Sequence, residues 1–249
     1  MRQNLADDRA PPGWRRLAEA GSMLARVYRS VGPLGERGPP DGVPLMVIPG
    51  FLATDRTTLG LQRALGQAGY RVAGWGMGLN RGARDDTLDR LAGRIEAHGR
   101  GAPMILIGWS LGGIYAREVA KHRPDLVDRV VTLGSPFSGD RRVNNNVWRL
   151  YEAVAGHPVN APPIATDPAQ KPPVPTLALW SRRDGIVAPA GARGQAGECD
   201  AECELDCTHM GFAVSARAYP KIISAVGDFV GKRRPTDAGA PVGRPTEES

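Results

Sequence analysis

The sequence is poor in the residues and patterns on which several classes of protein depend. Only three cysteines occur in 249 residues, all between 199 and 207, and an odd, clustered set is not the framework of a disulfide-stapled secreted domain. No run approaches the roughly 18 apolar residues of a membrane-spanning helix. Residues 1–16 carry charge and two prolines where a signal peptide has its apolar core. We therefore expect a cytoplasmic protein that does not span a membrane.

Lysine and aromatic residues are also scarce. The 28 arginines and 4 lysines exceed the 26 acidic residues and give a formal charge of +6, but the arginines are scattered over every segment and aromatic residues make up 6% of the chain. Nucleic-acid-binding surfaces gather basic residues on one face, often with aromatic residues among them. No nucleic-acid partner is therefore expected. The length suffices to bury a core without disulfides or metal.

Short apolar runs alternate regularly with helical periodicity. The apolar runs have the length of buried strands and cover 45–48, 71–75, 104–107, 130–133, 176–180 and 202–207. Helical spacing occupies 57–68, 86–98, 111–122 and 143–155, and a last helix is predicted over 212–230. Buried strands that alternate with helices predict an α/β fold with a mainly parallel sheet.

The two ends of the chain differ in composition from this alternating region. Residues 1–42 combine an amphipathic pattern over 14–30 with a Gly/Pro-rich link, and 231–249 is a polar tail that we expect to be disordered. The helix over 14–30 either docks on the domain or makes weak contact with an anionic membrane surface. One domain over 43–230 remains, interrupted by an irregular or lid-like excursion at 137–175.

The sharpest local motif is G-x-S-x-G, from Gly108 to Gly112. It follows a predicted strand and opens a predicted helix, and at such a tight turn the serine projects above the sheet while the glycines allow close packing. The bare pentapeptide also arises by chance in a glycine-rich chain, so the flanking elements give it its weight. A serine hydroxyl becomes a nucleophile when an imidazole accepts its proton. Ser110 is therefore the candidate nucleophile, and it requires a histidine.

Four histidines are available, and three of them lie near helix ends or open the proline-rich excursion: His98, His122 and His157. His209 follows a late apolar run and is the candidate base. The orienting acid is expected between the serine and the histidine in chain order. Asp184 fits best because it lies in an Asp-Gly turn just after the strand over 176–180. Asp140, beyond the strand over 130–133, is the rival.

Acyl transfer also requires donors for the oxyanion. The first is the backbone N–H of Leu111, which follows the nucleophile, and the second is expected from the loop after the first strand, at Phe51. Trp109 and Trp148 are candidates for an apolar substrate pocket, with core packing as the alternative for Trp109. The predicted helix over 143–155, which contains Trp148, is either a short lid or one more helix packed on the sheet.

In combination these stretches resemble the α/β-hydrolase superfamily, and within it bacterial esterase- and lipase-like serine hydrolases. The resemblance covers about 43–230 and rests on 47–52, 74–80, 108–118, 132–137 and 181–187. It implies the six-stranded minimal form of the fold with helices on both faces, and a triad of Ser110, Asp184 and His209 with oxyanion donors at Phe51 and Leu111. Many relatives have His-Gly where this chain has Pro49-Gly50, which leaves the backbone donor in place.

The expected activity is hydrolysis of a small-molecule or lipid carboxylic ester, as an esterase or lipase, without cofactor or metal. Two alternatives remain: transfer of the same acyl group to an acceptor other than water, and ligand binding without turnover. The cysteines are interpreted as apolar filler because Cys203, Leu205 and Cys207 alternate onto one strand face. A zinc site there would take His209 as its fourth ligand and remove the catalytic base.

Overall fold

The computed structural model describes residues 11, 35–164 and 167–231. The helix expected over 14–30 and the tail expected over 232–249 lie outside these residues. Within them, no helix is both long enough and apolar enough to cross a membrane.

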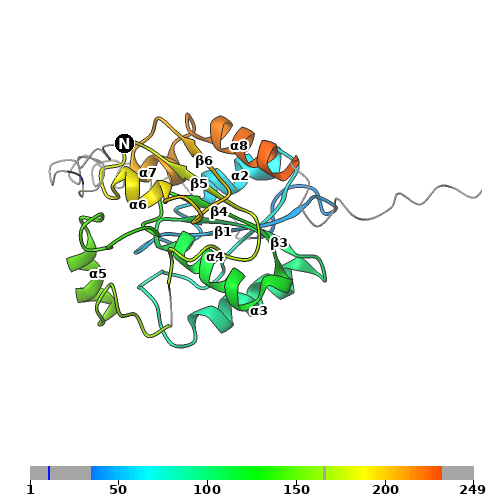
Figure 1. Ribbon diagram of the computed structural model, residues 1–249. Coiled ribbons are helices and arrows are strands. Elements are labelled where there is room, and N and C mark those ends of the chain that lie inside the picture. Colours follow the sequence, from blue (N-terminus) through cyan, green and yellow to red (C-terminus); the bar gives the residue numbers. More distant parts are fainter. Residues whose placement is uncertain (1–10, 12–34, 165–166, 232–249) are drawn as a thin grey trace, which may run out of the picture.

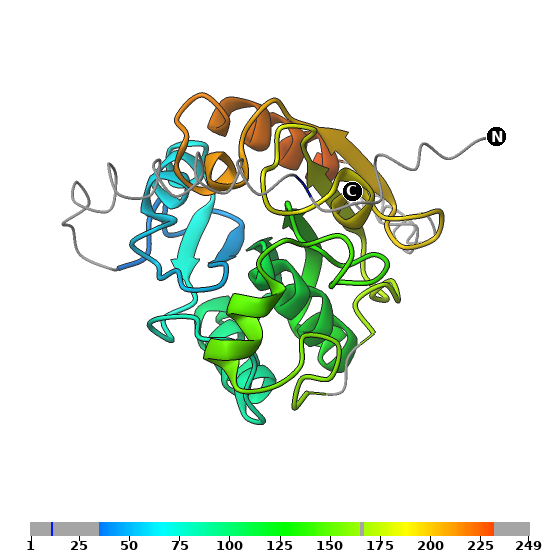
Figure 2. The same ribbon diagram turned by 90° about the vertical axis from the view of Figure 1, so that its left-hand side faces the viewer.

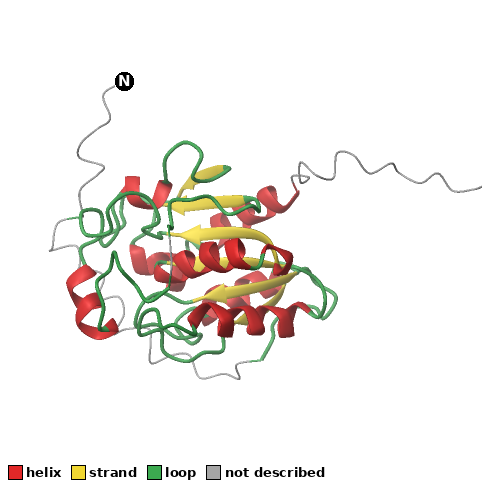
Figure 3. Cartoon of the chain, turned by 60° about the horizontal axis from the view of Figure 1, so that its bottom comes forward, coloured by secondary structure: helices red, strands yellow, loops and turns green. Residues whose placement is uncertain are grey.

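Six parallel strands form a single sheet at the centre of the molecule (Figures 1 and 3). Their order across the sheet is β2-β1-β3-β4-β5-β6. The strands are β1 (Pro44–Ile48), β2 (Arg71–Gly74), β3 (Met104–Trp109), β4 (Val127–Leu133), β5 (Thr176–Trp180) and β6 (Ala201–Glu204). The structure thus confirms the predicted six-stranded sheet. Because all strands run in one direction, the loops that follow them meet at one edge of the sheet.

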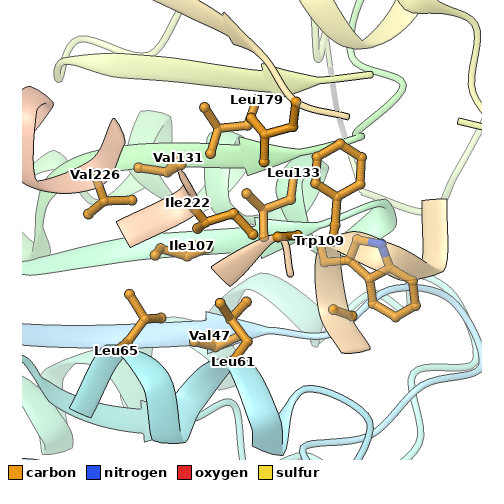
Figure 4. Close-up of a cluster of buried hydrophobic side chains, with 14 of the residues drawn as sticks. Val47, Leu61, Leu65, Ile107, Trp109, Val131, Leu133, Leu179, Ile222 and Val226 are labelled. Carbon is orange, nitrogen blue, oxygen red and sulfur yellow. The ribbon is translucent and has the colours of Figure 1, made fainter. Parts of the chain in front are cut away.

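Helices cover both faces of this sheet. The described helices are α2 (Leu59–Gln67), α3 (Thr87–Gly99), α4 (Leu111–His122), α5 (Trp148–Ala155), α6 (Pro189–Arg193), α7 (His209–Val214) and α8 (Tyr219–Gly231), with a short 3₁₀ turn at Pro124–Leu126. Apolar side chains of α2, α7 and α8 share one core with the sheet, and those of α3 and α4 share another. Figure 4 shows the first core, in which Leu61, Ile222 and Val226 pack over Val47 and neighbouring strand residues.

The strands are apolar on both sides because both faces are covered. Along β1, Val47 belongs to the core under α2 and α8, whereas Met46 and Ile48 belong to the core under α3 and α4. A strand buried on two faces loses the polar–apolar alternation of a half-exposed strand. This explains why the strands appear in the sequence as uninterrupted apolar runs.

Several elements differ from their predicted bounds, and three of these differences have a visible cause or consequence. The last predicted helix is two helices, because α7 ends at Val214, where Ser215 is extended, and α8 begins only at Tyr219. The Thr208 side chain accepts a hydrogen bond from Gly211 N–H and starts α7 three residues earlier than predicted. The strand predicted over 202–207 is the shorter β6. The helix predicted from 143 begins at Trp148, because 144–146 pair with another loop.

Candidate active site

Ser110 occupies the turn between β3 and α4 in a backbone conformation that few side chains adopt. Its φ of 54° and ψ of −121° place it in the left-handed region that favours glycine. The turn is held on both sides, since Ser110 N–H donates to Leu133 O at 2.9 Å and Ser110 O accepts from Gly113 N–H at 3.0 Å. The serine is half-buried, in contrast to the fully buried strand that precedes it.

The glycines around Ser110 let three segments approach closely. A Cβ on Gly108 would lie 2.3 Å from the Gly112 carbonyl oxygen, and a Cβ on Gly112 would lie 2.3 Å from the carbonyl oxygen of Ile48. The loop after β1 also packs directly on the serine, because a Cβ on Gly50 would lie 3.0 Å from Ser110 Cβ. The predicted oxyanion loop and the predicted nucleophile are therefore neighbours.

Asp184 and His209 form a buried pair above the same edge of the sheet. His209 Nδ1 lies 2.8 Å from Asp184 Oδ2, and their side chains are 1% and 3% exposed. The other carboxylate oxygen, Oδ1, accepts hydrogen bonds from the backbone N–H groups of Ile186 and Val187, both at 2.8 Å. One oxygen thus fixes the carboxylate and the other orients the imidazole, which is the geometry that an acid–base pair needs.

Two residues that the sequence argument did not single out help to position this pair. Ser181 Oγ donates to Cys207 O at 2.7 Å and ties the loop of the acid to the loop of the histidine. Gly134, with a φ of 55°, allows the acid to approach β4, since a Cβ there would lie 2.9 Å from Asp184 Oδ2. Gly134 could have been singled out from the sequence, because it directly follows the strand predicted over 130–133.

Trp109 connects the histidine to the nucleophile turn. Its indole Nε1–H donates to the His209 carbonyl oxygen at 3.0 Å, and the two rings lie 5.6 Å apart between centroids. The tryptophan is 2% exposed and belongs to the core under α7 and α8, so it packs and positions rather than lining an open pocket. Because Trp109 immediately precedes Ser110, this bond ties the backbone of His209 to the turn that carries Ser110.

The two backbone groups predicted to bind the oxyanion are unengaged. Within the described part of the chain, neither Phe51 N–H nor Leu111 N–H donates a hydrogen bond. Leu111 begins α4, where the first N–H groups of a helix have no partner within the helix. Two such donors, one in the loop after β1 and one at the start of α4, suit a developing negative charge.

Asn80 holds the loop of Phe51 in shape. Its side-chain amide donates to Pro49 O at 2.9 Å, and its backbone N–H donates to Ala53 O at 2.9 Å. Its backbone carbonyl oxygen accepts a hydrogen bond from Leu52 N–H at 2.7 Å. Leu52 needs such support because its φ is 56°. Asn80 ends the stretch 74–80 that carries part of the family resemblance, but no role was predicted for it, since nothing local distinguishes it from a turn residue.

The remaining predicted residues lie elsewhere. Asp140 is exposed and accepts hydrogen bonds from Asn160 and the backbone of Arg142, which lower the pKa of its carboxyl group. It therefore does not orient His209, and this geometry favours Asp184 over its rival. Trp148 is half-exposed on α5, between the guanidinium groups of Arg142 and Arg149, which lie 5.3 and 5.1 Å from its ring centroid.

The cysteines are free thiols, and Cys203 packs with Leu205 and Cys207 against the core under α8, as the alternation predicts. No group of three His, Cys, Asp or Glu side chains among the described residues is arranged to hold a metal ion.

No protein-family model and no curated protein matches the sequence. Solved structures do match. An enol-lactonase from Burkholderia xenovorans LB400 aligns with a TM-score of 0.56 and 18% identity over 80% of this chain and 95% of that chain. A membrane phospholipase A, described as a bacterial virulence factor, aligns with a TM-score of 0.54 and 15% identity over 86% of this chain and 90% of that chain. A thioesterase domain from the curacin biosynthetic pathway aligns with a TM-score of 0.53 and 15% identity over 76% of this chain and 93% of that chain.

All of these structures are α/β-hydrolase fold proteins, and this chain has the same fold. The class that the sequence resemblance implied is therefore shown at the level of the fold.

Proposed function

We propose that this protein is a serine hydrolase that cleaves carboxylic esters through an acyl-enzyme on Ser110. The observation that carries the proposal is the buried Asp184–His209 pair, 2.8 Å between Nδ1 and Oδ2, which the Trp109–His209 hydrogen bond ties to the turn of a serine held at a φ of 54°. A left-handed backbone at a non-glycine residue is maintained only where the surrounding structure enforces it, and such residues cluster at active sites.

In this proposal His209 accepts the hydroxyl proton of Ser110 as the oxygen attacks the acyl carbon. The negative charge on the former carbonyl oxygen is stabilised by the N–H groups of Phe51 and Leu111. His209 then gives its proton to the departing alcohol. In the second half a water molecule attacks the acyl-enzyme and His209 takes a proton from that water. His209 then passes this proton to Ser110 Oγ as the acid leaves.

An ester is proposed as substrate because the three structures named above, chosen from many that match, are described as a lactonase, a phospholipase and a thioesterase, which cleave ester or thioester bonds. The aromatic rings of Phe51 and Tyr151 pack against each other beside the predicted oxyanion donor, with ring centroids 5.1 Å apart. Such an aromatic surface suits an uncharged acyl or alcohol group. We therefore propose a small-molecule or lipid ester.

The test is hydrolysis of p-nitrophenyl esters from acetyl to long-chain acyl, together with labelling by a fluorophosphonate. We expect Ser110→Ala to abolish both. The matched control is Ser224→Ala, which removes an exposed serine on α8 and is expected to leave both unchanged. Ester hydrolysis that survives in Ser110→Ala at near wild-type rate would reject the proposal.

A further inference from the structure

The entry to helix α5 pairs with the loop that carries the candidate acid. Residues 144–146 and 186–188 form a short antiparallel pairing, in which Asn146 N–H donates to Ile186 O at 3.1 Å and Ala188 N–H donates to Asn144 O at 2.8 Å. The sequence suggested only a turn and a helix cap for the three consecutive asparagines. Their observed partner lies about forty residues further along the chain.

Asn146 contributes both backbone and side-chain hydrogen bonds to this region. Besides its backbone bond to Ile186 O, its side-chain amide donates to Gly185 O at 2.7 Å and to Pro11 O at 3.1 Å. Asn146 therefore contacts the carbonyl groups of two consecutive residues, Gly185 and Ile186, immediately after Asp184.

These two carbonyls belong to the peptide units that hold Asp184. A peptide unit is planar and trans, so its C=O and N–H point in opposite directions. The unit with Gly185 C=O carries Ile186 N–H, and the unit with Ile186 C=O carries Val187 N–H. Both N–H groups donate to Asp184 Oδ1 at 2.8 Å. Asn146 thus holds each of these peptide units from the side opposite the carboxylate.

We infer that Asn146 is a positioning residue for the reaction, acting on His209 through these two peptide units and Asp184. The inference rests on the proposed function, since it assigns to Asn146 the task of keeping the acid in place. Released from Asn146 Nδ2, the Gly185–Ile186 peptide is free to rotate and Oδ1 loses a fixed donor. Oδ2 then no longer meets His209 Nδ1 at a constant distance, and small displacements at a reacting group reduce rates strongly.

The same segment of chain also contacts the other side of the site. Five residues after Asn146, the Tyr151 ring packs on Phe51, and its hydroxyl accepts from Ala83 N–H at 3.4 Å. Figure 2 views the molecule from the side on which α5 lies. A substitution at Tyr151 is therefore a useful comparison, because it disturbs the oxyanion loop without touching the peptide units behind Asp184.

The experiment is a double-mutant cycle between Asn146 and Asp184, measured as kcat and KM for a p-nitrophenyl ester. We expect Asn146→Ala to lower kcat by about 10- to 100-fold with KM within twofold. In an Asp184→Asn background, the same substitution is expected to lower kcat no further, because residues that act through one contact are not additive. Tyr151→Ala is expected to multiply its effect with that of Asp184→Asn.

The control is Asn160→Ala, which removes an exposed asparagine that donates to Asp140, and we expect it to leave kcat unchanged in both backgrounds. A second variant, Asn146→Asp, keeps the shape of the side chain and removes the donor, so it is expected to lose at least as much kcat as Asn146→Ala. The inference would be overturned if the kcat losses of Asn146→Ala and Asp184→Asn multiplied, or if either Asn146 variant kept full activity. It would also be overturned if both Asn146 variants lost their cooperative thermal unfolding, because Asn146 would then be needed for the fold rather than for positioning the acid.

A measurement without substrate separates this inference from the proposed function. A proton shared in a buried Asp–His hydrogen bond gives a far-downfield NMR resonance, expected in the wild type and absent from Asp184→Asn. We expect Asn146→Ala to broaden it through faster exchange with solvent. An inactive wild-type protein would reject the proposed function, whereas an unchanged resonance in Asn146→Ala would reject the role of Asn146.

Discussion

Replacing Ser110 by glycine is expected to stabilise the fold while it abolishes catalysis. At a φ of 54° and ψ of −121° a non-glycine residue carries strain on the order of 1–3 kcal/mol, and glycine adopts this region freely. The greater freedom of glycine in the unfolded chain returns about 0.5–1 kcal/mol of that gain. The net gain in the free energy of unfolding is therefore about 0–2.5 kcal/mol, centred near 1 kcal/mol.

The measurement is thermal unfolding of Ser110→Gly beside Ser110→Ala. Both variants lack the hydroxyl group, but alanine keeps the Cβ and hence the strain. For a chain of this size each kcal/mol moves Tm by roughly 2–4 °C, so at a net gain near 1 kcal/mol Ser110→Gly is expected to melt about 2–4 °C above Ser110→Ala. Equal Tm values would show that the turn is not strained by its side chain, and would refute this account of Ser110.

Three further predictions concern buried charges. Asp184→Asn is expected to lower kcat by about 10⁴-fold, because an amide cannot hold the imidazole in the required tautomer, and a loss below tenfold in steady-state kinetics would exclude this role. Arg117 is 1% exposed and donates hydrogen bonds to four backbone carbonyl oxygens, those of residues 168–170 and Glu198. Arg117→Met leaves these carbonyls without their donor and is expected to lower the free energy of unfolding, measured by urea titration, by about 2–4 kcal/mol. An unchanged urea midpoint of unfolding would contradict this prediction. Burial raises the pKa of Asp55. As pH rises, Asp55 therefore releases its proton at a lower pH in the unfolded chain than in the folded protein. The wild type is expected to lose stability relative to Asp55→Asn as pH rises from about 3.8 through the raised pKa. Parallel curves of stability against pH for the two proteins would argue against that shift.

The parts of the site that were predictable are those that local sequence determines. Ser110 is identified by a strand, a five-residue turn and a helix that are contiguous, and Asp184 and His209 follow from chain order after recognisable apolar runs. The fold was predictable for a similar reason, because strands buried on both faces keep their apolar runs whatever their order in the sheet.

The supporting contacts were not predictable, because they join segments distant in sequence. Asn80 binds the loop of Pro49, and Asn146 binds Gly185; each is an asparagine in a turn-like setting whose partner only the folded sheet brings near. The same limit explains α7, whose start depends on a single side-chain cap at Thr208, and the entry to α5, where pairing with another loop prevails over helical periodicity.

The order of the strands has a consequence for the newly made chain. Ser110 follows β3 and emerges from synthesis about a hundred residues before His209, which comes after β6 at the edge of the sheet. Domains generally fold as units once their chain is available. In the proposed function the serine hydroxyl therefore gains its base only when the whole domain folds, with β6 paired to β5 and His209 over the sheet. In the proposed function, a nascent chain that ends before β6 would thus carry Ser110 without its base, and the serine hydroxyl would have no imidazole to accept its proton.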